Sequence, residues 1–187
     1  MSSPKRAAGL IVLGLIVISL PSRAGGQDTS GVVTVPSALP GIVVEVHVRA
    51  GDKVQQGDVL AKLESRLAQL DVEAARARLE VAEAMYRVVL VATQGAQHQV
   101  ERVKALQASK AVSEEEVNRA ILALETHKAE VHAKQAAVKL AQIEVQKAQF
   151  VLDQHIIHSP GAGVVALVHV NPGEAVSKFG RVVQIKK

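Results

Sequence analysis

Histidines are the first residues of this sequence that could support chemistry, because neutral imidazole is a common metal ligand. His155 and His158 stand three residues apart near Asp153, and His47 and His169 form a second pair. No three or four of these side chains have a recognised ligand spacing. The pattern therefore disfavours a metal site, and we expect His47 and His169 to lie on a solvated face of a strand.

The motifs of the common enzyme classes are absent from the sequence. It has no nucleophile elbow, no phosphate loop and no paired carboxylates, and Gly161-Ala162-Gly163 precedes an expected strand, which is the wrong order for dinucleotide binding. The chain also has no cysteine, which removes disulfide and thiolate chemistry. We expect a protein that is not an enzyme and that holds no cofactor.

The N-terminal residues 1–24 are typical of a secretory signal peptide. Lys5 and Arg6 precede an apolar run over 7–20, and small residues stand around Ser22 and Ala24. This run is shorter than the ~20 residues that a spanning helix needs, so a cleaved signal is favoured over a retained membrane anchor. Export is expected in both cases.

The charge of the chain changes once this signal is set aside. Without Lys5, Arg6 and Arg23 the formal net charge falls from +4 to +1. Aromatic residues are 2% of the chain and tryptophan is absent, so no platform for base stacking is available. Nucleic-acid binding is therefore not expected.

A stretch that occurs twice indicates how the remaining chain is organised. Residues 41–54 match residues 163–176 at a constant offset of 122, which pairs Asp52 with Glu174. Each copy predicts a strand, a glycine turn and a second strand, and one such hairpin is only marginally stable alone. The two copies are therefore expected to form one sandwich, with one extra residue before the last strand of the second copy. Period-2 alternation predicts a core face made of Ile42, Val44, Val46 and Val48.

The residues between the two copies have a helical period. The first helix is expected over 65–108, with a repeat that fades from Thr93 to Gly95, and Ser113 followed by Glu116 predicts the capping box of a return helix. Helices of about 40 residues would give an antiparallel coiled-coil hairpin of ~60 Å over 65–153. The expected heptad seam consists of Leu67, Leu70, Ala74, Ala77, Val81, Ala84, Val88 and Val91 in the first helix, and Val117, Leu124, Val131, Val138, Val145 and Leu152 in the second.

This arrangement resembles the HlyD-like periplasmic adaptors, or membrane fusion proteins, of bacterial efflux and secretion systems. The matching stretches begin at Gly41, Gly51-Asp52 and Gly57-Asp58 in the first half, and at Leu152 and Pro172-Gly173 in the second, with departures from the family pattern at His155, Ser159 and Ala162. The resemblance implies an α+β fold. A split biotinyl/lipoyl-like β-sandwich, or barrel-sandwich hybrid, would be formed by 31–64 and 154–187 and would carry the hairpin.

The resemblance also implies a function. Such an adaptor works in the periplasm, in some cases associated with the inner membrane, and links an inner-membrane transporter to an outer-membrane TolC-like duct. Several copies would form a ring, and Arg102, Leu106 and Ser113 at the hairpin tip would contact the duct. Adaptors generally continue into a β-barrel and a membrane-proximal domain that contact the transporter. We expect the sandwich and the hairpin to account for all of residues 31–187, so the transporter contact is left open.

Two other functions remain open from the sequence. One is a stand-alone periplasmic coiled-coil scaffold that binds a different helical partner. The other is a lipoyl or biotinyl carrier. The alignment places Leu67 where a carrier would have its modified lysine, and Lys62, within an expected strand, is the one nearby substitute.

Overall fold

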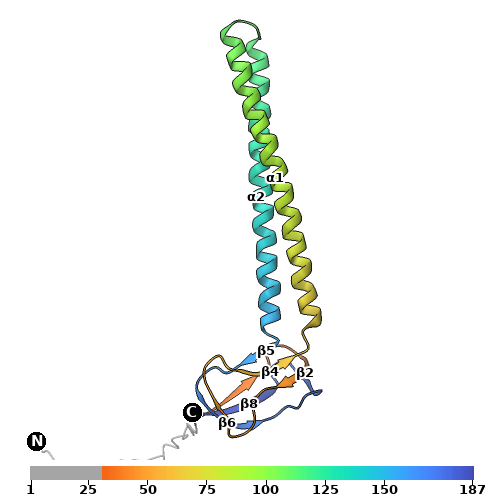
Figure 1. The fold of residues 1–187 in the computed structure, drawn as a ribbon, viewed down its shortest axis with the longest axis vertical. Helices are drawn as coiled ribbons and strands as arrows, with labels where there is room; N and C mark the ends of the chain where they lie inside the picture. Colours follow the sequence, from red (N-terminus) through yellow and green to blue (C-terminus); the bar gives the residue numbers. More distant parts are fainter. Residues whose placement is uncertain (1–30) are drawn as a thin grey trace, which may run out of the picture. The chain divides into compact units, whose positions relative to one another are not determined.

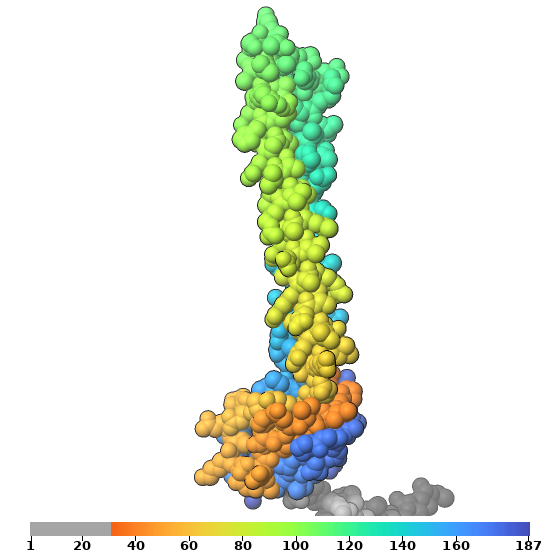
Figure 2. Space-filling view, turned by 45° about the vertical axis from the view of Figure 1, so that its right-hand side comes forward, coloured from red at the N-terminus to blue at the C-terminus, as the bar shows by residue number. Residues whose placement is uncertain are grey.

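The computed structural model describes residues 31–187, and the signal peptide expected at 1–24 lies outside the described residues. Within 31–187, no helix is both long enough and apolar enough to cross a membrane. Two long helices form a hairpin that projects from a small two-sheet sandwich (Figures 1 and 2). The elements are β1 (Val32–Pro36), β2 (Gly41–Val46), β3 (Lys53–Val54), β4 (Val59–Leu63), α1 (Arg66–Ala108), α2 (Glu114–Asp153), β5 (Ile156–His158), β6 (Gly163–Val168), β7 (Ala175–Val176) and β8 (Arg181–Lys186).

Both sheets of the sandwich are antiparallel and draw on both halves of the chain. One has the strand order β1-β8-β6-β3 and the other β5-β4-β2-β7. Each sheet thus contains two strands from before the hairpin and two from after it. The expected split sandwich with an inserted helical hairpin is confirmed.

Backbone hydrogen bonds repeat between the two halves with the offset of 122. The Gly51 N–H donates to Val165 O at 2.8 Å, and the Gly173 N–H donates to Val43 O at 2.7 Å. The turns before the last strands repeat as well, from Asp58 N to Gln55 O and from Gly180 N to Ser177 O. The halves are therefore related by an approximate two-fold axis.

The prediction of one extra residue before the last strand of the second half is wrong. Since the turn bonds keep the offset of 122, Phe179 occupies the place of Gly57, with φ of +64° against +90°. Such a conformation is unusual for a bulky residue. The exchange of glycine for phenylalanine concealed the match in the sequence.

The expected core face of β2 is also partly wrong. Val43 is fully buried, whereas Ile42 and Val44 are about half exposed. The register of β2 against β4 shifts between Val43 and Glu45, so a bulge reverses the alternation and returns Val48 to the core. β6 has the same burial pattern and its own register shift between Val165 and Leu167.

The helices pack against each other along a heptad seam, but α1 uses a different row of side chains from the expected one. Leu67, Val88 and Val91 are about 70% exposed. The buried or half-buried row is offset from them and combines alanines with valines and a few larger side chains. It comprises Ala68, Val72, Ala75, Leu79, Ala82, Tyr86, Val89, Thr93, Ala96, Val100 and Val103.

The seam and the N-cap predicted for α2 are confirmed, whereas the capping box is only half formed, since no bond from the Ser113 N–H to the Glu116 carboxylate is present among residues 31–187. All six expected seam residues are buried or half-buried, and Ser113 Oγ accepts a hydrogen bond from the Glu116 N–H at 3.3 Å as the N-cap. α1 runs without a break through Gly95, where the sequence indicated a loosened repeat. The seam of α1 continues through Thr93 and Ala96 to Val100 and Val103, so the expected fading of the repeat at 93–95 is wrong.

Candidate functional site

The hairpin tip is a short turn between two long helices. α1 ends at Ala108 and α2 begins at Glu114. Ser109 closes α1, since its hydroxyl donates to Leu106 O at 2.8 Å, and Lys110 reverses the chain with φ of +59°. Val103 and Val117 are buried below the turn and fix the two helix ends against each other. The turn and the two helix ends are therefore held in a fixed arrangement at the tip.

The three residues assigned to duct contact lie on or close to this turn. Leu106 is 43% exposed, and Ser113 begins α2 on the other side of the turn. Arg102 is exposed one helical turn below Leu106, about 6 Å along the axis, on the same face of α1. Its guanidinium donates to the Gln99 side chain. An apolar and a cationic group are therefore offered side by side, while Ser113 serves as a cap.

Charges at the tip are divided between the helices. α1 brings Arg102 and Lys104, while α2 begins with the carboxylates of Glu114, Glu115 and Glu116, which favour the positive end of the helix dipole. Below the tip, the Gln97 amide donates to Glu101 at 3.0 Å and lowers the pKa of that carboxyl, with a smaller contribution from His98. The end of the hairpin can pair with cationic and with anionic groups of a partner.

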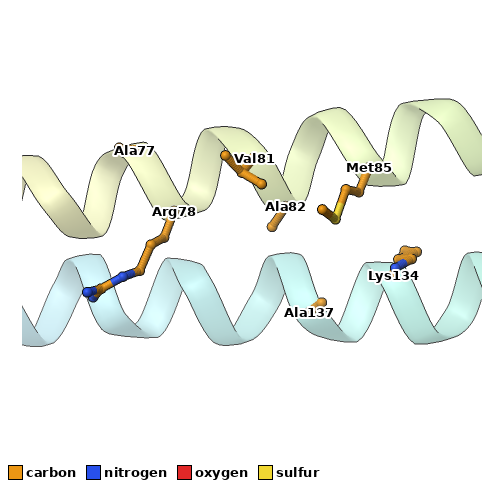
Figure 3. Close-up of a pocket in the computed structure, with 7 residues that line it drawn as sticks. All are labelled: Ala77, Arg78, Val81, Ala82, Met85, Lys134 and Ala137. Carbon is orange, nitrogen blue, oxygen red and sulfur yellow. The ribbon is translucent and has the colours of Figure 1, made fainter.

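The shaft of the hairpin carries an apolar groove on one side. Val81 and Met85 of α1 and Ala137 of α2 line a cavity of about 380 Å³ (Figure 3). Arg78 and Lys134 stand at its two ends. Val81 belongs to the row that the sequence assigned to the seam. The sequence gives no sign of this surface, because its periodicity predicts that row on the inside.

The residues considered for other chemistry are spread over the sandwich. Lys62 Nζ lies 2.9 Å from Glu45 Oε2, which also contacts His47 Nε2 at 3.0 Å, and Lys62 lowers the pKa of Glu45 by this hydrogen bond and its charge. His169 is half-buried and its Nε2 is buried without a partner, so the expected solvated face is wrong for His169. Across 31–187, no three His, Asp or Glu side chains are grouped to hold a metal.

Comparison with known proteins identifies the relatives of this chain. The family model for the CzcB-like barrel-sandwich hybrid domain matches residues 31–187. The chain is 24% identical over 153 residues to the multidrug resistance protein MdtA of Photorhabdus laumondii and 28% identical over 156 residues to MdtA of Salmonella heidelberg. These matches cover 82% and 83% of this chain, but 35% and 34% of the relatives. The chain thus spans about a third of their length.

Solved structures show the same fold. MacA from Actinobacillus actinomycetemcomitans superposes with a TM-score of 0.76 and 27% identity over 82% of this chain and 48% of MacA. The membrane fusion protein Spr0693 of Streptococcus pneumoniae has a TM-score of 0.54 at 21% identity, over 83% of this chain and 62% of that protein, and shows the fold alone. By its family model and by its fold, the chain belongs to the periplasmic adaptor, or membrane fusion protein, family with a CzcB-like barrel-sandwich hybrid domain.

Proposed function

We propose that the protein is a periplasmic adaptor that links an inner-membrane transporter to an outer-membrane TolC-like duct, for efflux or secretion. It acts by assembly and not by catalysis. The observation that carries the proposal is the hairpin of 43- and 40-residue helices, whose tip exposes Leu106 beside Arg102. An apolar contact beside a guanidinium suits the carbonyl and carboxylate groups at the end of a helical duct.

A homo-oligomeric ring is part of this proposal. Each helix has apolar side chains outside the seam, such as Val88 of α1 and Leu140 of α2, which are 69% and 60% exposed. A contact between the α1 row of one copy and the α2 row of the next would be heterologous, and such contacts form a ring when the rotation from copy to copy closes. Val88→Glu should weaken self-association in sedimentation velocity. Unchanged sedimentation would contradict this lateral contact.

The bridging function is tested by crosslinking from the tip in cells. The chain has no native cysteine, so Ala111→Cys gives a unique thiol at the exposed turn and spares the cap of Ser113. We expect a crosslinker to capture an outer-membrane duct, identified by mass spectrometry. Gln146→Cys, which places a thiol on the exposed shaft of α2, is the matched control and should not capture the duct.

The role of Arg102 is tested by charge reversal. Arg102→Asp should abolish capture of the duct through Ala111→Cys, while Arg87→Asp, an exposed change about 22 Å lower on α1, should leave it intact. Helical circular dichroism controls for folding.

Capture of an unrelated helical protein alone would favour the stand-alone scaffold. A mass increase on Lys62 in the native host would favour the carrier. The transporter contact is assigned to no residue of 31–187.

A further inference from the structure

A second cavity lies where the hairpin joins the sandwich. It has a volume of about 290 Å³ and is lined by the edge strands β1 and β5 and by the last turn of α2. Val35 and Ile157, at 6% and 5% exposure, belong to the core of the sandwich, so the cavity reaches the core. Phe150 of α2 lines the same cavity, although it is 63% exposed.

The polar side chains that line this cavity are Asp153, Gln154 and His158. Asp153 is the one carboxylate among its lining residues, and its Oδ1 accepts from Gln149 at 2.9 Å, which leaves Oδ2 available. His158 Nδ1 lies 2.9 Å from Gly57 O. Because a carbonyl oxygen only accepts, Nδ1 carries the hydrogen in the neutral ring and Nε2 remains an acceptor.

A smaller opening in the same sandwich provides an internal contrast. It has a volume of about 60 Å³ and is lined by Val33, Pro160, Ile185 and neighbouring residues, with Lys187 as its charged group. It offers neither an aromatic ring nor a carboxylate. Of these two openings, the one at the base of the hairpin, which we name the base cavity, combines an apolar floor, an aromatic ring and a carboxylate.

We propose that the base cavity binds small aromatic ammonium compounds. The ring of the ligand would cover Val35 and Ile157, and its cation would lie near Asp153 and the face of Phe150, where carboxylate and aromatic quadrupole both attract positive charge. An anionic ligand would meet Asp153 without a compensating lysine or arginine among the lining residues. Because one wall belongs to α2 and the others to the strands, a bound ligand also bridges hairpin and sandwich.

The probe for this site is benzyltrimethylammonium, titrated into the ¹⁵N-labelled protein and followed by amide chemical shifts. We expect saturable shifts centred on Phe150, Asp153 and His158. Phenylacetate, with the same ring and the opposite charge, should produce no saturable shifts there. Absence of saturation by the ammonium probe, or equal binding of phenylacetate, would overturn the proposal.

Matched variants separate this site from non-specific binding. Phe150→Ala and Asp153→Asn should each weaken binding about five- to tenfold, because each removes one attraction for the cation. Phe150→Leu keeps apolar bulk and should still lose affinity. Phe179→Ala, the other exposed phenylalanine, and Glu144→Gln, another exposed carboxylate of α2, should bind like the parent. Equal affinity of Asp153→Asn and the parent would contradict the site, and the amide spectrum of each variant reports its folding.

Discussion

The two halves of the sandwich share one backbone plan and differ in how tightly their side chains are packed. Val43 and Val165 occupy equivalent buried places, and the bonds around them repeat with the same offset. The glycines that begin β2 and β6 differ. A Cβ on Gly41 would lie 3.6 Å from Leu63, whereas on Gly163 it would lie 2.5 Å from both Ile185 Cγ2 and Lys186 O. The backbone hydrogen bonds follow the two-fold symmetry, while the space around these two glycines does not.

The largest expected difference between the halves is at these two glycines. Gly163→Ala should lower the free energy of unfolding by about 3 kcal/mol, because a backbone oxygen cannot move aside as a flexible side chain can. Gly41→Ala meets ordinary van der Waals distances and should change it by less than about 1 kcal/mol. Urea denaturation measures both. Equal losses of unfolding free energy in the two variants would contradict this difference between the halves.

The equivalent core valines should show where the halves agree. Val43 and Val165 are 0% and 1% exposed, so truncation to alanine removes buried methyl groups and leaves a cavity in each case. We expect a loss of about 2 kcal/mol for each variant, equal within about 0.5 kcal/mol. Denaturation of the two variants side by side tests this. A loss confined to one half would show that the core is not shared.

The turns before β4 and β8 should respond unequally to alanine. Gly57 has φ of +90°, so Gly57→Ala introduces strain and should destabilise the protein by about 1 kcal/mol. Phe179 already carries that strain at φ of +64° and is 71% exposed, so Phe179→Ala should change stability by less than about 0.5 kcal/mol. Thermal unfolding of both variants provides the measurement. A larger loss for Phe179→Ala would show that its ring contributes packing.

The smallest expected difference between the halves is in how their stability depends on pH. Lys62, through a hydrogen bond and its charge, lowers the pKa of Glu45 below its usual 4.5, and the equivalent places in the second half hold Leu167 and Gln184. A lowered pKa stabilises the fold above 4.5, and this contribution is lost as the pH falls through the folded-state value. NMR titration of the Glu45 carboxyl should give a midpoint below 4.5 that rises in Lys62→Met. An unchanged midpoint would count against the pair.

The sequence was sufficient to predict the fold because the repeat and the heptads are long patterns. It was insufficient to choose the seam of α1, because two apolar rows run along that helix. The row that includes Leu67 and Val88 is purely aliphatic and has the stronger hydrophobic signal, yet the row beginning at Ala68, which also contains Tyr86 and Thr93, faces α2. Which row is inside depends on how the side chains of the two helices pack together, and that is a property of both helices.

The other differences between the sequence-based predictions and the structure arise from single local features. The bulge that brings Val43 inward depends on pairing with β4, which no period in β2 can indicate. Phe179 in a glycine conformation hid the equivalence of the turns. The tip residues Arg102, Leu106 and Ser113 were assigned by resemblance, and their duct contact stays a prediction. The base cavity joins residues far apart in the chain and leaves no local pattern.

The exchange of strands between the two sheets has a consequence for the order of folding. Neither sheet can be completed until β5 to β8 have been synthesised, so β1 to β4 must wait while the helices emerge. Closing so long a loop is entropically costly, and non-local pairing slows folding. If α1 and α2 pack against each other early, Leu63 and Ile156 are brought close together. Strands β4 and β5 can then pair without closing a long flexible loop. The hairpin would then serve first as a folding aid, before it serves as a contact surface.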